Sequence, residues 1–271
     1  MTPEAVFVHD GEAYTATELA LGPWAPGALH GGAPAALIAH VLAQSAPDPE
    51  LRLARVTYEF VRPVPLGSLS VHVDQVRPGR RMTLLDALLT DAEGTEVTRA
   101  RGLLLRAAEI EATAPQAPPF PGPEAGEVND WSEERPMFAT HAMDIRFVEG
   151  RFREPGASTA WFRLRAPLIA GEPTLPLDRA AAAGDFGNGI ASVLSWAEHV
   201  FINPDLTLYL EREPMDDWVA LQSEMRVVRG SVSVAESVLW DRRGRIGRAF
   251  QSLLVGPRPD GVGGAISGGT P

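Results

Sequence analysis

The sequence predicts an α+β protein made of two similar halves, each with a central helix wrapped by an antiparallel sheet. Three observations support this fold class. Each half contains an apolar, small-residue segment followed by segments of alternating polarity, and a proline-rich stretch separates the halves. The chain also repeats itself at a constant offset of 150 residues over about fifty positions, which indicates a duplicated unit. The equated pairs include Thr57 with Thr207, Arg62 with Arg212, Asp91 with Asp241 and Gly94 with Gly244.

The first half is expected within residues 1–106. Residues 13–22 are interpreted as a first strand or a short segment that leads into the helix. Gly31, Gly32 and Pro34 form a helix start signal. Proline lacks a backbone N–H, and the N–H groups of a first helical turn have no hydrogen-bond partner within the helix, so proline is tolerated there. Residues 35–44 are apolar almost all round, which predicts a buried helix. Period-two alternation then predicts strands at residues 56–60, 69–73, 84–90 and 97–105, with a hairpin turn at 91–94.

The second half is expected within residues 136–256, after a proline-rich and acidic linker at 107–135. It restarts near Met143 and continues with a strand at 160–165. Residues 177–200 have a helical composition. Three glycines within this range would each destabilise a helix by about 1 kcal/mol, so their presence needs a reason other than helix propensity. Alternation predicts further strands at residues 206–210, 221–227, 232–240 and 249–255. Residues 257–271 are expected to form a flexible tail.

The composition excludes several classes of function. The 271 residues include no cysteine, which excludes thiolate catalysis, disulfides and cysteine-based metal sites. The formal net charge of −11 disfavours nonspecific binding to nucleic acid or to an anionic membrane. The sequence has no phosphate-binding glycine loop, no serine nucleophile elbow and no metal-ligand spacing among its histidines. Because it has neither a signal-peptide pattern nor a segment long enough to span a bilayer, we expect a soluble cytoplasmic protein without metal or cofactor.

Asp185 is the first candidate for chemistry, because it interrupts an apolar segment of small residues. Its carboxylate would serve as a general base or would orient a water molecule. The neighbouring Gly184 would let a substrate approach the backbone closely. The alternative interpretation is that Asp185 only caps the N-terminus of a helix that begins after Gly184.

Two amides in the second half are further candidates. Gln251 shares a face of the last predicted strand with apolar residues, and a buried amide without a partner costs about 1–3 kcal/mol. It would hold the attacking water or a substrate carbonyl, or else it is satisfied by the backbone at a bend of the sheet. Asn203 would donate a second hydrogen bond to the same water, or else it only starts a turn before Pro204.

His30, Gly31 and Gly32 precede the first predicted helix. Free N–H groups at a helix start suit a developing oxyanion, so these residues are candidates for oxyanion or substrate binding. If the two halves pack symmetrically, this helix start would face the helix of Asp185. The alternative is that His30 is a turn residue and that the two glycines only give flexibility.

Four strings, in this order, resemble the bacterial acyl-CoA thioesterase II family. They are HGGAPAALIAHVL (30–42), AAAAGDFGNGIASVLSW (180–196), INPDLTLYLEREP (202–214) and GRIGRAFQSLLV (244–255). The resemblance implies a double hot-dog fold, in which each of two repeats wraps a sheet around a central helix. It also implies hydrolysis of a thioester by water that Asp185, Asn203 and Gln251 activate. Two departures are that many members have threonine where Asn203 stands, and glutamine where Ala33 stands.

The resemblance further implies an acyl-CoA or related thioester as the substrate, no nucleic-acid partner, no membrane and a homo-oligomer, namely a dimer of double hot-dogs. Two alternatives remain. One is a non-catalytic acyl-CoA-binding protein that has kept the fold, and the other is an enoyl-CoA hydratase, which the lack of a histidine after Pro204 disfavours. Under the 150-residue offset Asn203 matches Leu53 and Gln251 matches Arg101, so we expect the chemistry in the second half alone.

Overall fold

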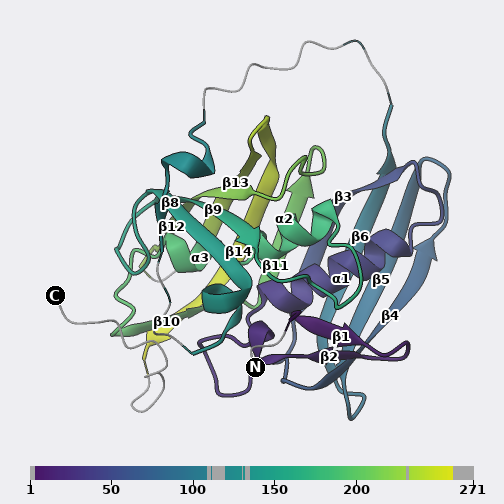
Figure 1. Ribbon diagram of the computed structural model, residues 1–271, viewed down its shortest axis with the longest axis horizontal. Helices are drawn as coiled ribbons and strands as arrows, with labels where there is room; N and C mark the ends of the chain where they lie inside the picture. The colour runs from purple at the N-terminus through teal and green to yellow at the C-terminus, as the bar shows by residue number, and fades with distance from the viewer. Residues whose placement is uncertain are drawn as a thin grey trace.

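The strands of the computed structural model form one continuous sheet, within the described residues 4–108, 111, 120–129, 131, 135–229 and 232–258. The strand order is β1-β2-β4-β5-β6-β3-β11-β14-β13-β12-β9-β8-β7, and β10 pairs additionally with β14. Figure 1 shows helix α1 lying across the strands of the first half, and α2 and α3 lying against those of the second half. The helices therefore lie on the inner side of a strongly curved sheet.

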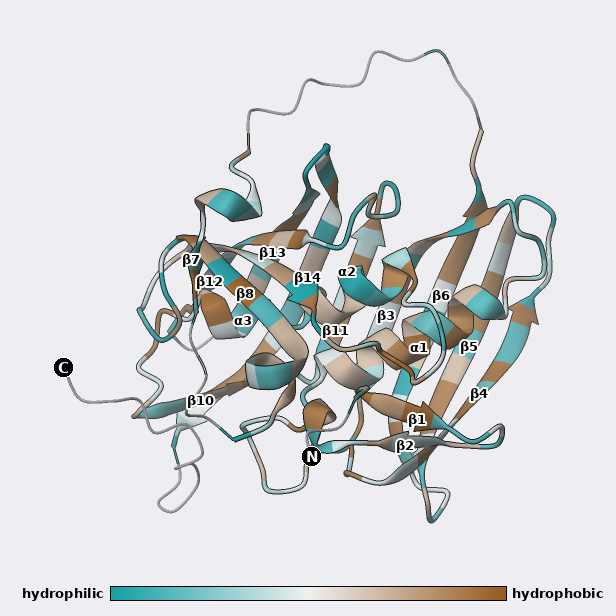
Figure 2. Ribbon diagram, viewed as in Figure 1, coloured by the Kyte–Doolittle hydropathy of each residue, from teal (hydrophilic) through white to brown (hydrophobic). Residues whose placement is uncertain are grey.

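In the first half, the predicted helix and all four long strands are confirmed. Helix α1 spans Gly32–Gln44, and it begins at the predicted glycine–proline start signal. The strands β3 to β6 span Leu51–Phe60, Ser68–Arg77, Met82–Asp91 and Glu96–Arg106. Figure 2 shows apolar residues along α1 and bands of alternating hydropathy along the strands that it faces. The segment predicted at 13–22 contains the short strand β2 (Tyr14–Ala16), which pairs with β1 (Phe7–His9), and a single helical turn at Glu18–Ala20.

In the second half, the five predicted strands are confirmed, the strands Met143–Glu149 and His199–Ile202 were not predicted, and the helix differs from the prediction. The strands β8, β9, β11, β12, β13 and β14 span Met143–Glu149, Ser158–Leu164, Asp205–Leu210, Val219–Arg226, Ser233–Asp241 and Gly244–Pro257. The prediction of one helix over 177–200 is wrong. Helix α2 (Pro176–Gly184) ends at Asp185, a single turn α3 follows at Gly187–Ile190, and β10 (His199–Ile202) comes next.

The glycines around this break have a packing reason. A Cβ atom on Gly184 would lie 2.6 Å from the Leu208 side chain of β11, and one on Gly187 would lie 2.6 Å from the Ser237 hydroxyl of β13. The chain therefore needs glycine there to lie closely on the sheet. This finding corrects the expectation that Gly184 opens the backbone to a substrate, because its open side is occupied by a core leucine.

Part of the predicted linker also belongs to the sheet. Residues 123–125 form a helical turn, and β7 (Glu127–Val128) pairs with β8 at the sheet edge. A further helical turn, Phe138–Ala142, leads into β8. The rest of the predicted linker, at 109–110, 112–119, 130 and 132–134, and the predicted tail from residue 259 lie outside the described residues.

The two halves meet at the pairing of β3 with β11. In this antiparallel pair Thr57 lies directly opposite Thr207, the residue that the 150-residue offset equates with it. From this junction outward, the strand order on one side is β3, β6, β5 and β4, and on the other side it is β11, β14, β13 and β12. The same order of strands is thus found on both sides of one pair of equivalent threonines.

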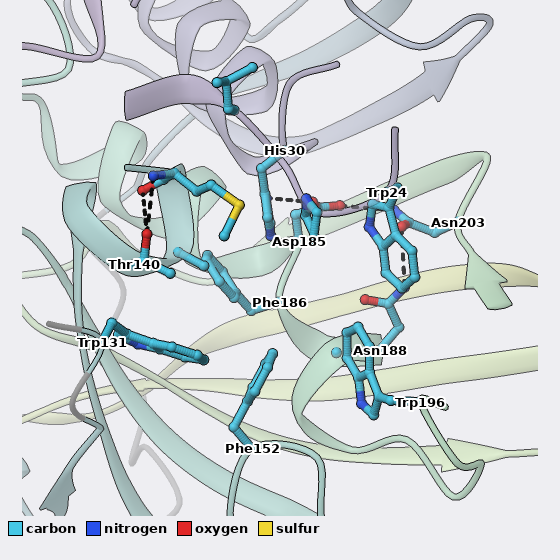
Figure 3. Close-up of a pocket in the computed structure, with 15 residues that line it drawn as sticks. Trp24, His30, Trp131, Thr140, Phe152, Asp185, Phe186, Asn188, Trp196 and Asn203 are labelled. Atoms are coloured by element: carbon cyan, nitrogen blue, oxygen red, sulfur yellow. Dashed lines mark hydrogen bonds and ion pairs between the residues drawn. The ribbon is translucent and has the colours of Figure 1, made fainter. Parts of the chain in front are cut away.

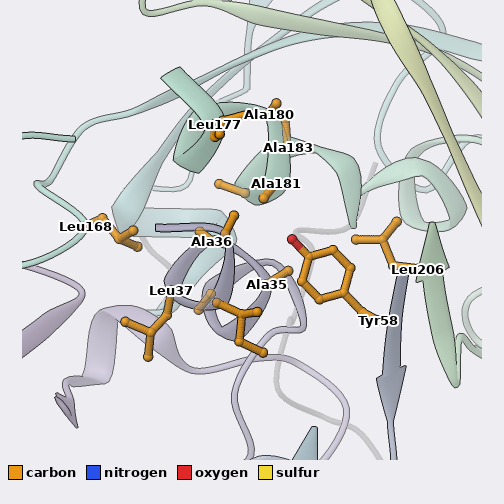
Figure 4. Close-up of a cluster of buried hydrophobic side chains, with 14 of the residues drawn as sticks. Ala35, Ala36, Leu37, Tyr58, Leu168, Leu177, Ala180, Ala181, Ala183 and Leu206 are labelled. Atoms are coloured by element: carbon orange, nitrogen blue, oxygen red, sulfur yellow. The ribbon is translucent and has the colours of Figure 1, made fainter. Parts of the chain in front are cut away.

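Helices α1 and α2 approach each other closely through small side chains. Figure 4 shows Ala35 and Ala36 of α1 beside alanines 180, 181 and 183 of α2, with Leu37, Leu168 and Leu177 at the margin. At the start of α1, a Cβ atom on Gly32 would lie 2.6 Å from the Ala182 carbonyl oxygen. This close approach sets the start of α1 against the end of α2, which is where Asp185 lies.

The other end of the helix pair holds a buried polar cluster. The Nδ1 atom of His40 lies 2.9 Å from Asp178 Oδ2, and its Nε2 atom lies 3.2 Å from Glu172 Oε2. Burial opposes the charge on His40, but its hydrogen bonds and charge interactions with these two carboxylates outweigh burial and raise its pKa. Burial raises the pKa of Asp178 against the opposing effect of His40. Both shifts favour retention of a proton in the cluster.

The predicted turn at 91–94 is confirmed, and its equivalent at 241–244 is more deeply buried. Asp91 Oδ1 accepts hydrogen bonds from the N–H groups of Glu93 and Thr95. Asp241 is almost fully buried and accepts two hydrogen bonds of 2.6 Å from the guanidinium group of Arg212, together with two backbone N–H bonds. Equivalent aspartates therefore hold equivalent turns, one at the surface and one within the protein.

Candidate active site

The break between α2 and α3 places Asp185 at the centre of a buried polar group. Asp185 is the residue that ends α2, so the alternative that it caps the N-terminus of a following helix is wrong. Its Oδ1 atom accepts a hydrogen bond of 2.8 Å from Asn203 Nδ2 and one of 3.3 Å from Gln251 Nε2. The structure therefore brings together three residues that are spread over 66 positions of the sequence, from Asp185 to Gln251.

The hydrogen atoms of both amides are already used within this group. A side-chain amide has two N–H hydrogens. Asn203 Nδ2 also donates to the Asp205 carbonyl at 3.1 Å, and Gln251 Nε2 also donates to the Asp185 carbonyl at 3.1 Å. Each amide thus gives one hydrogen to the carboxylate and one to the backbone. This arrangement fixes the orientation of the Asp185 carboxylate and leaves its Oδ2 atom for other partners.

Asn188 completes the group, and the sequence analysis assigned it no role. Its backbone N–H donates to Gln251 Oε1 at 2.9 Å, and its side-chain Nδ2 donates to Asn203 Oδ1 at 3.2 Å. One residue of α3 therefore holds both amides from the side opposite to Asp185. The only signal for Asn188 in the sequence was its position three residues after Asp185, within the glycine-rich segment.

The start of α1 lies directly against the free side of the carboxylate. His30 Nδ1 lies 3.2 Å from Asp185 Oδ2, and its ring stacks on Phe186 with a centroid distance of 4.4 Å. A Cβ atom on Gly31 would lie 2.7 Å from the same Oδ2 atom. The expectation that this helix start faces the helix of Asp185 is thus confirmed, and His30 is more than a turn residue.

The backbone N–H groups of the two glycines differ in their partners. The Gly32 N–H donates to His30 Nδ1 at 3.0 Å, so it is not free in this arrangement. The Gly31 N–H has no acceptor among the described residues. A single Nδ1 atom either accepts from Gly32 or, when it is protonated, donates to Asp185, because it cannot do both at once.

Asp185, His30, Asn188 and Asn203 line one part of a pocket whose other walls are mostly aromatic and aliphatic. Figure 3 shows the rings of Trp131, Phe152 and Trp196 around the space beyond Phe186, with the polar groups above them. The empty space, including the open mouth, is about 530 Å³, but the room for water-sized molecules is only about 30 Å³. That room corresponds to about two water molecules. The remaining lining residues are Leu21, Pro23, Trp24, Met137, Ala139, Thr140 and Gly189.

The match of Gln251 with Arg101, taken from the 150-residue offset, is wrong in the folded protein. The offset equates Leu85 with Ala235, and these residues pair with Gly102 and Gln251, respectively. The last strand pairs one residue earlier in the second half, since Thr90 pairs with Glu96 but Trp240 pairs with Arg245, so that Gly102 lies where Gln251 lies in the other half. Arg101 faces outward and pairs with Asp86. The first half still offers no polar side chain at this place.

Among the described residues, no cluster of three or more histidine and carboxylate side chains has the arrangement to hold a metal ion. Likewise, none of the helices within the described ranges is long and apolar enough to cross a membrane. The polar groups that line the pocket are a carboxylate, an imidazole and side-chain amides.

Comparisons with known sequences identify related domains in both halves. Residues 20–105 match the profile of the acyl-CoA thioesterase N-terminal domain, and residues 111–255 match that of the acyl-CoA thioesterase C-terminal domain. A search of curated proteins finds no match.

Comparisons with solved structures identify the fold. The chain is similar to a putative thioesterase II from Thermobifida fusca YX (21% identity, 93% of this chain and 96% of that chain, TM-score 0.72). It is also similar to a conserved protein of unknown function with a hot-dog fold from Alicyclobacillus acidocaldarius (15% identity, 94% of this chain and 97% of that chain, TM-score 0.72). A third similar structure is that of an acyl-CoA thioesterase II from Mycobacterium marinum (18% identity, 86% of this chain and 90% of that chain, TM-score 0.62). At these identities the likeness shows the fold, which is the hot-dog fold.

Proposed function

The chain belongs to the acyl-CoA thioesterase family and is a thioesterase, and on this premise we propose that Asp185 activates the water that attacks the thioester of an acyl-CoA. One observation carries the proposal. Asn203 and Gln251 both donate to Oδ1 of the carboxylate, while Oδ2 lies beside His30, and Asp185 itself lines the pocket. A carboxylate fixed through one oxygen has the other available as a general base.

In the proposed reaction, Asp185 Oδ2 accepts a proton from the water as the water oxygen bonds to the acyl carbon. The carbonyl oxygen becomes an oxyanion, for which the Gly31 N–H at the start of α1 is the available donor. When the oxyanion collapses, the carbon–sulfur bond breaks and the CoA thiolate leaves. The thiolate takes a proton from Asp185, either directly or through His30 Nδ1, so that the products are a carboxylic acid and a thiol.

Asn203 and Gln251 act as positioning residues in this scheme, which revises the expectation that they hold the water. Their N–H hydrogens are committed to Asp185 and to backbone carbonyls, so neither has one to spare for a water molecule. Asn188 supports both amides. The asparagine found where many family members have threonine donates to the carboxylate as a threonine hydroxyl would, which favours an active enzyme over a binding protein.

The same contact of His30 with Asp185 favours a second candidate, hydration of an enoyl-CoA. That reaction also uses an aspartate–histidine pair, and the pair exists here in space although the sequence separates its members. The loss of the enoyl absorbance of crotonyl-CoA, measured beside thioester cleavage, distinguishes the two reactions. Hydration without thiol release would replace the present proposal.

We also propose that the fold is a double hot-dog that arose by duplication, with repeats at residues 1–106 and 136–256. The common order of strands and the pairing of Thr57 with Thr207 support this proposal. By analogy with the family, we propose that the protein assembles as a dimer of such units, which sedimentation analysis tests. A monomer at micromolar concentration would contradict the assembly.

The test of the proposed function is thiol release from a panel of acyl-CoAs with the purified protein. The chain contains no cysteine, so a thiol reagent reacts with the released CoA and not with the enzyme. We expect release that is proportional to enzyme concentration for at least one acyl group. Absence of release from every thioester of the panel would overturn the proposal.

A further inference from the structure

The walls of the pocket differ from those of a simple aliphatic tunnel. Beyond the polar groups, five of the fifteen lining residues carry a tryptophan or phenylalanine ring: Trp24, Trp131, Phe152, Phe186 and Trp196. Their rings present flat faces and edges to the pocket, whereas the aliphatic contribution is limited to a few side chains such as Leu21 and Met137. A pocket of this composition favours groups that interact with aromatic rings by stacking or by edge-to-face contact.

The aromatic walls brace one another. Trp24 and Trp196 stack with centroids 5.2 Å apart and planes 10° apart, and both make edge contacts with the buried Phe201. Phe152 lies against Trp196 at 5.3 Å and makes an edge contact with Trp131 at 5.0 Å. Because each ring is held by at least one other, the far wall cannot retreat at one position without disturbing its neighbours.

The pocket is also short of room. Its cavity volume of about 30 Å³ is filled by about two water molecules. A long, flexible chain would require a tunnel through the braced rings, and it would lose its rotational freedom there. A flat acyl ring needs a slot only one ring thick, so it requires a smaller displacement of the braced rings than a long chain does, and it would gain aromatic contacts that a saturated chain cannot make.

We propose that the preferred substrate is the CoA thioester of a compact acid that carries a planar aromatic ring, bound with this ring among Phe152, Phe186 and Trp196. This inference rests on the proposed function, because it assumes that the thioester carbonyl lies beside Asp185. Phe186 stacks on His30, so one face of the acyl ring would lie close to the residues that perform the reaction.

The experiment compares kcat/KM for phenylacetyl-CoA with that for octanoyl-CoA, which has the same number of acyl carbons, and includes butyryl-CoA and palmitoyl-CoA. We expect phenylacetyl-CoA to exceed each of the three aliphatic substrates by about tenfold or more, which is about 1.4 kcal/mol. Equal or faster turnover of octanoyl-CoA or palmitoyl-CoA would overturn the inference. Preference for butyryl-CoA would also overturn it, because the pocket would then select small size alone.

A pair of matched variants locates the preference. Phe152→Leu removes a ring but keeps apolar volume in the pocket wall, so we expect the ratio of phenylacetyl-CoA to octanoyl-CoA turnover to fall about threefold or more. Phe120→Leu removes a ring that stacks on Trp240 at 4.5 Å, outside the pocket, and should leave the ratio unchanged. An unchanged ratio in Phe152→Leu would contradict the inference. Failure of every thioester to react would instead contradict the proposed function.

Discussion

Replacement of Asp185 by asparagine separates the catalytic role that we propose for this residue from its structural role. The asparagine has almost the same shape as the aspartate, and its carbonyl oxygen can take the place of Oδ1. There it would keep the hydrogen bonds from Asn203 and Gln251, at 2.8 and 3.3 Å. Its NH₂ group would take the place of Oδ2, 3.2 Å from His30 Nδ1, where it competes with the Gly32 N–H for the single Nδ1 lone pair.

The expected magnitudes follow from these contacts. Because the hydrogen bonds from Asn203 and Gln251 are kept, the free energy of unfolding should change by only about 1 kcal/mol. An amide cannot take a proton from water, so kcat should fall by about 10²- to 10⁴-fold, the usual contribution of a general base. That loss corresponds to an increase of about 2.7–5.4 kcal/mol in the activation barrier.

Thiol release under saturating substrate measures kcat, and urea denaturation measures stability. Asp178→Asn is the matched control, because it makes the same change in the other buried aspartate of α2, at the far end of the helix pair. We expect Asp178→Asn to lower stability through its contact with His40 and to keep its activity per folded molecule. A kcat for Asp185→Asn within threefold of wild type would refute the reasoning.

Further predictions concern the glycine beside the carboxylate and two buried charges. Gly31→Ala places a Cβ atom 2.7 Å from the carboxylate and should lower kcat about tenfold to a hundredfold in thiol-release assays, whereas Gly256→Ala, which meets no atom within 4 Å, should not change it. Because the pKa of His40 is raised, its protonated form stabilises the fold below about pH 6.5, and this contribution is lost as the pH rises through the raised value. Thermal unfolding should therefore show Tm falling as the pH rises above about 6.5, with a smaller fall in His40→Gln. Asp241→Ala should lower the free energy of unfolding in urea by about 2–3 kcal/mol, and Asp91→Ala at the equivalent exposed turn by about 1 kcal/mol or less.

Specific outcomes would contradict each of these predictions. A kcat of Gly31→Ala equal to that of wild type would show that the start of α1 and the Asp185 carboxylate can move apart without a loss of activity. The same pH dependence of Tm in wild type and His40→Gln would remove the histidine cluster as its cause. Equal destabilisation by Asp241→Ala and Asp91→Ala would show that burial of the turn aspartate does not determine its contribution.

The elements that local pattern specifies were predictable from the sequence. Strand alternation identified the four long strands of the first half and the strands β9, β11, β12, β13 and β14 of the second, because the period of two is a property of neighbouring residues. The helix start at Gly31 and Gly32 was also local, because proline and glycine act through their own backbone geometry. The helix over 177–200 was wrongly predicted, since composition could not show that Gly184 and Gly187 pack on Leu208 and Ser237 of distant strands.

The sequence by itself determined the fold class, the internal offset and the identity of Asp185, Asn203 and Gln251 as candidates. Only the tertiary structure decided what each of them can do, because the roles depend on which hydrogen atoms and lone pairs are already used. It committed both amides to orienting the carboxylate, added Asn188 to the group and set His30 against the free oxygen. These partners come from separate elements of the sheet and helices, and no spacing along the chain records distances that arise only when the two halves pack together.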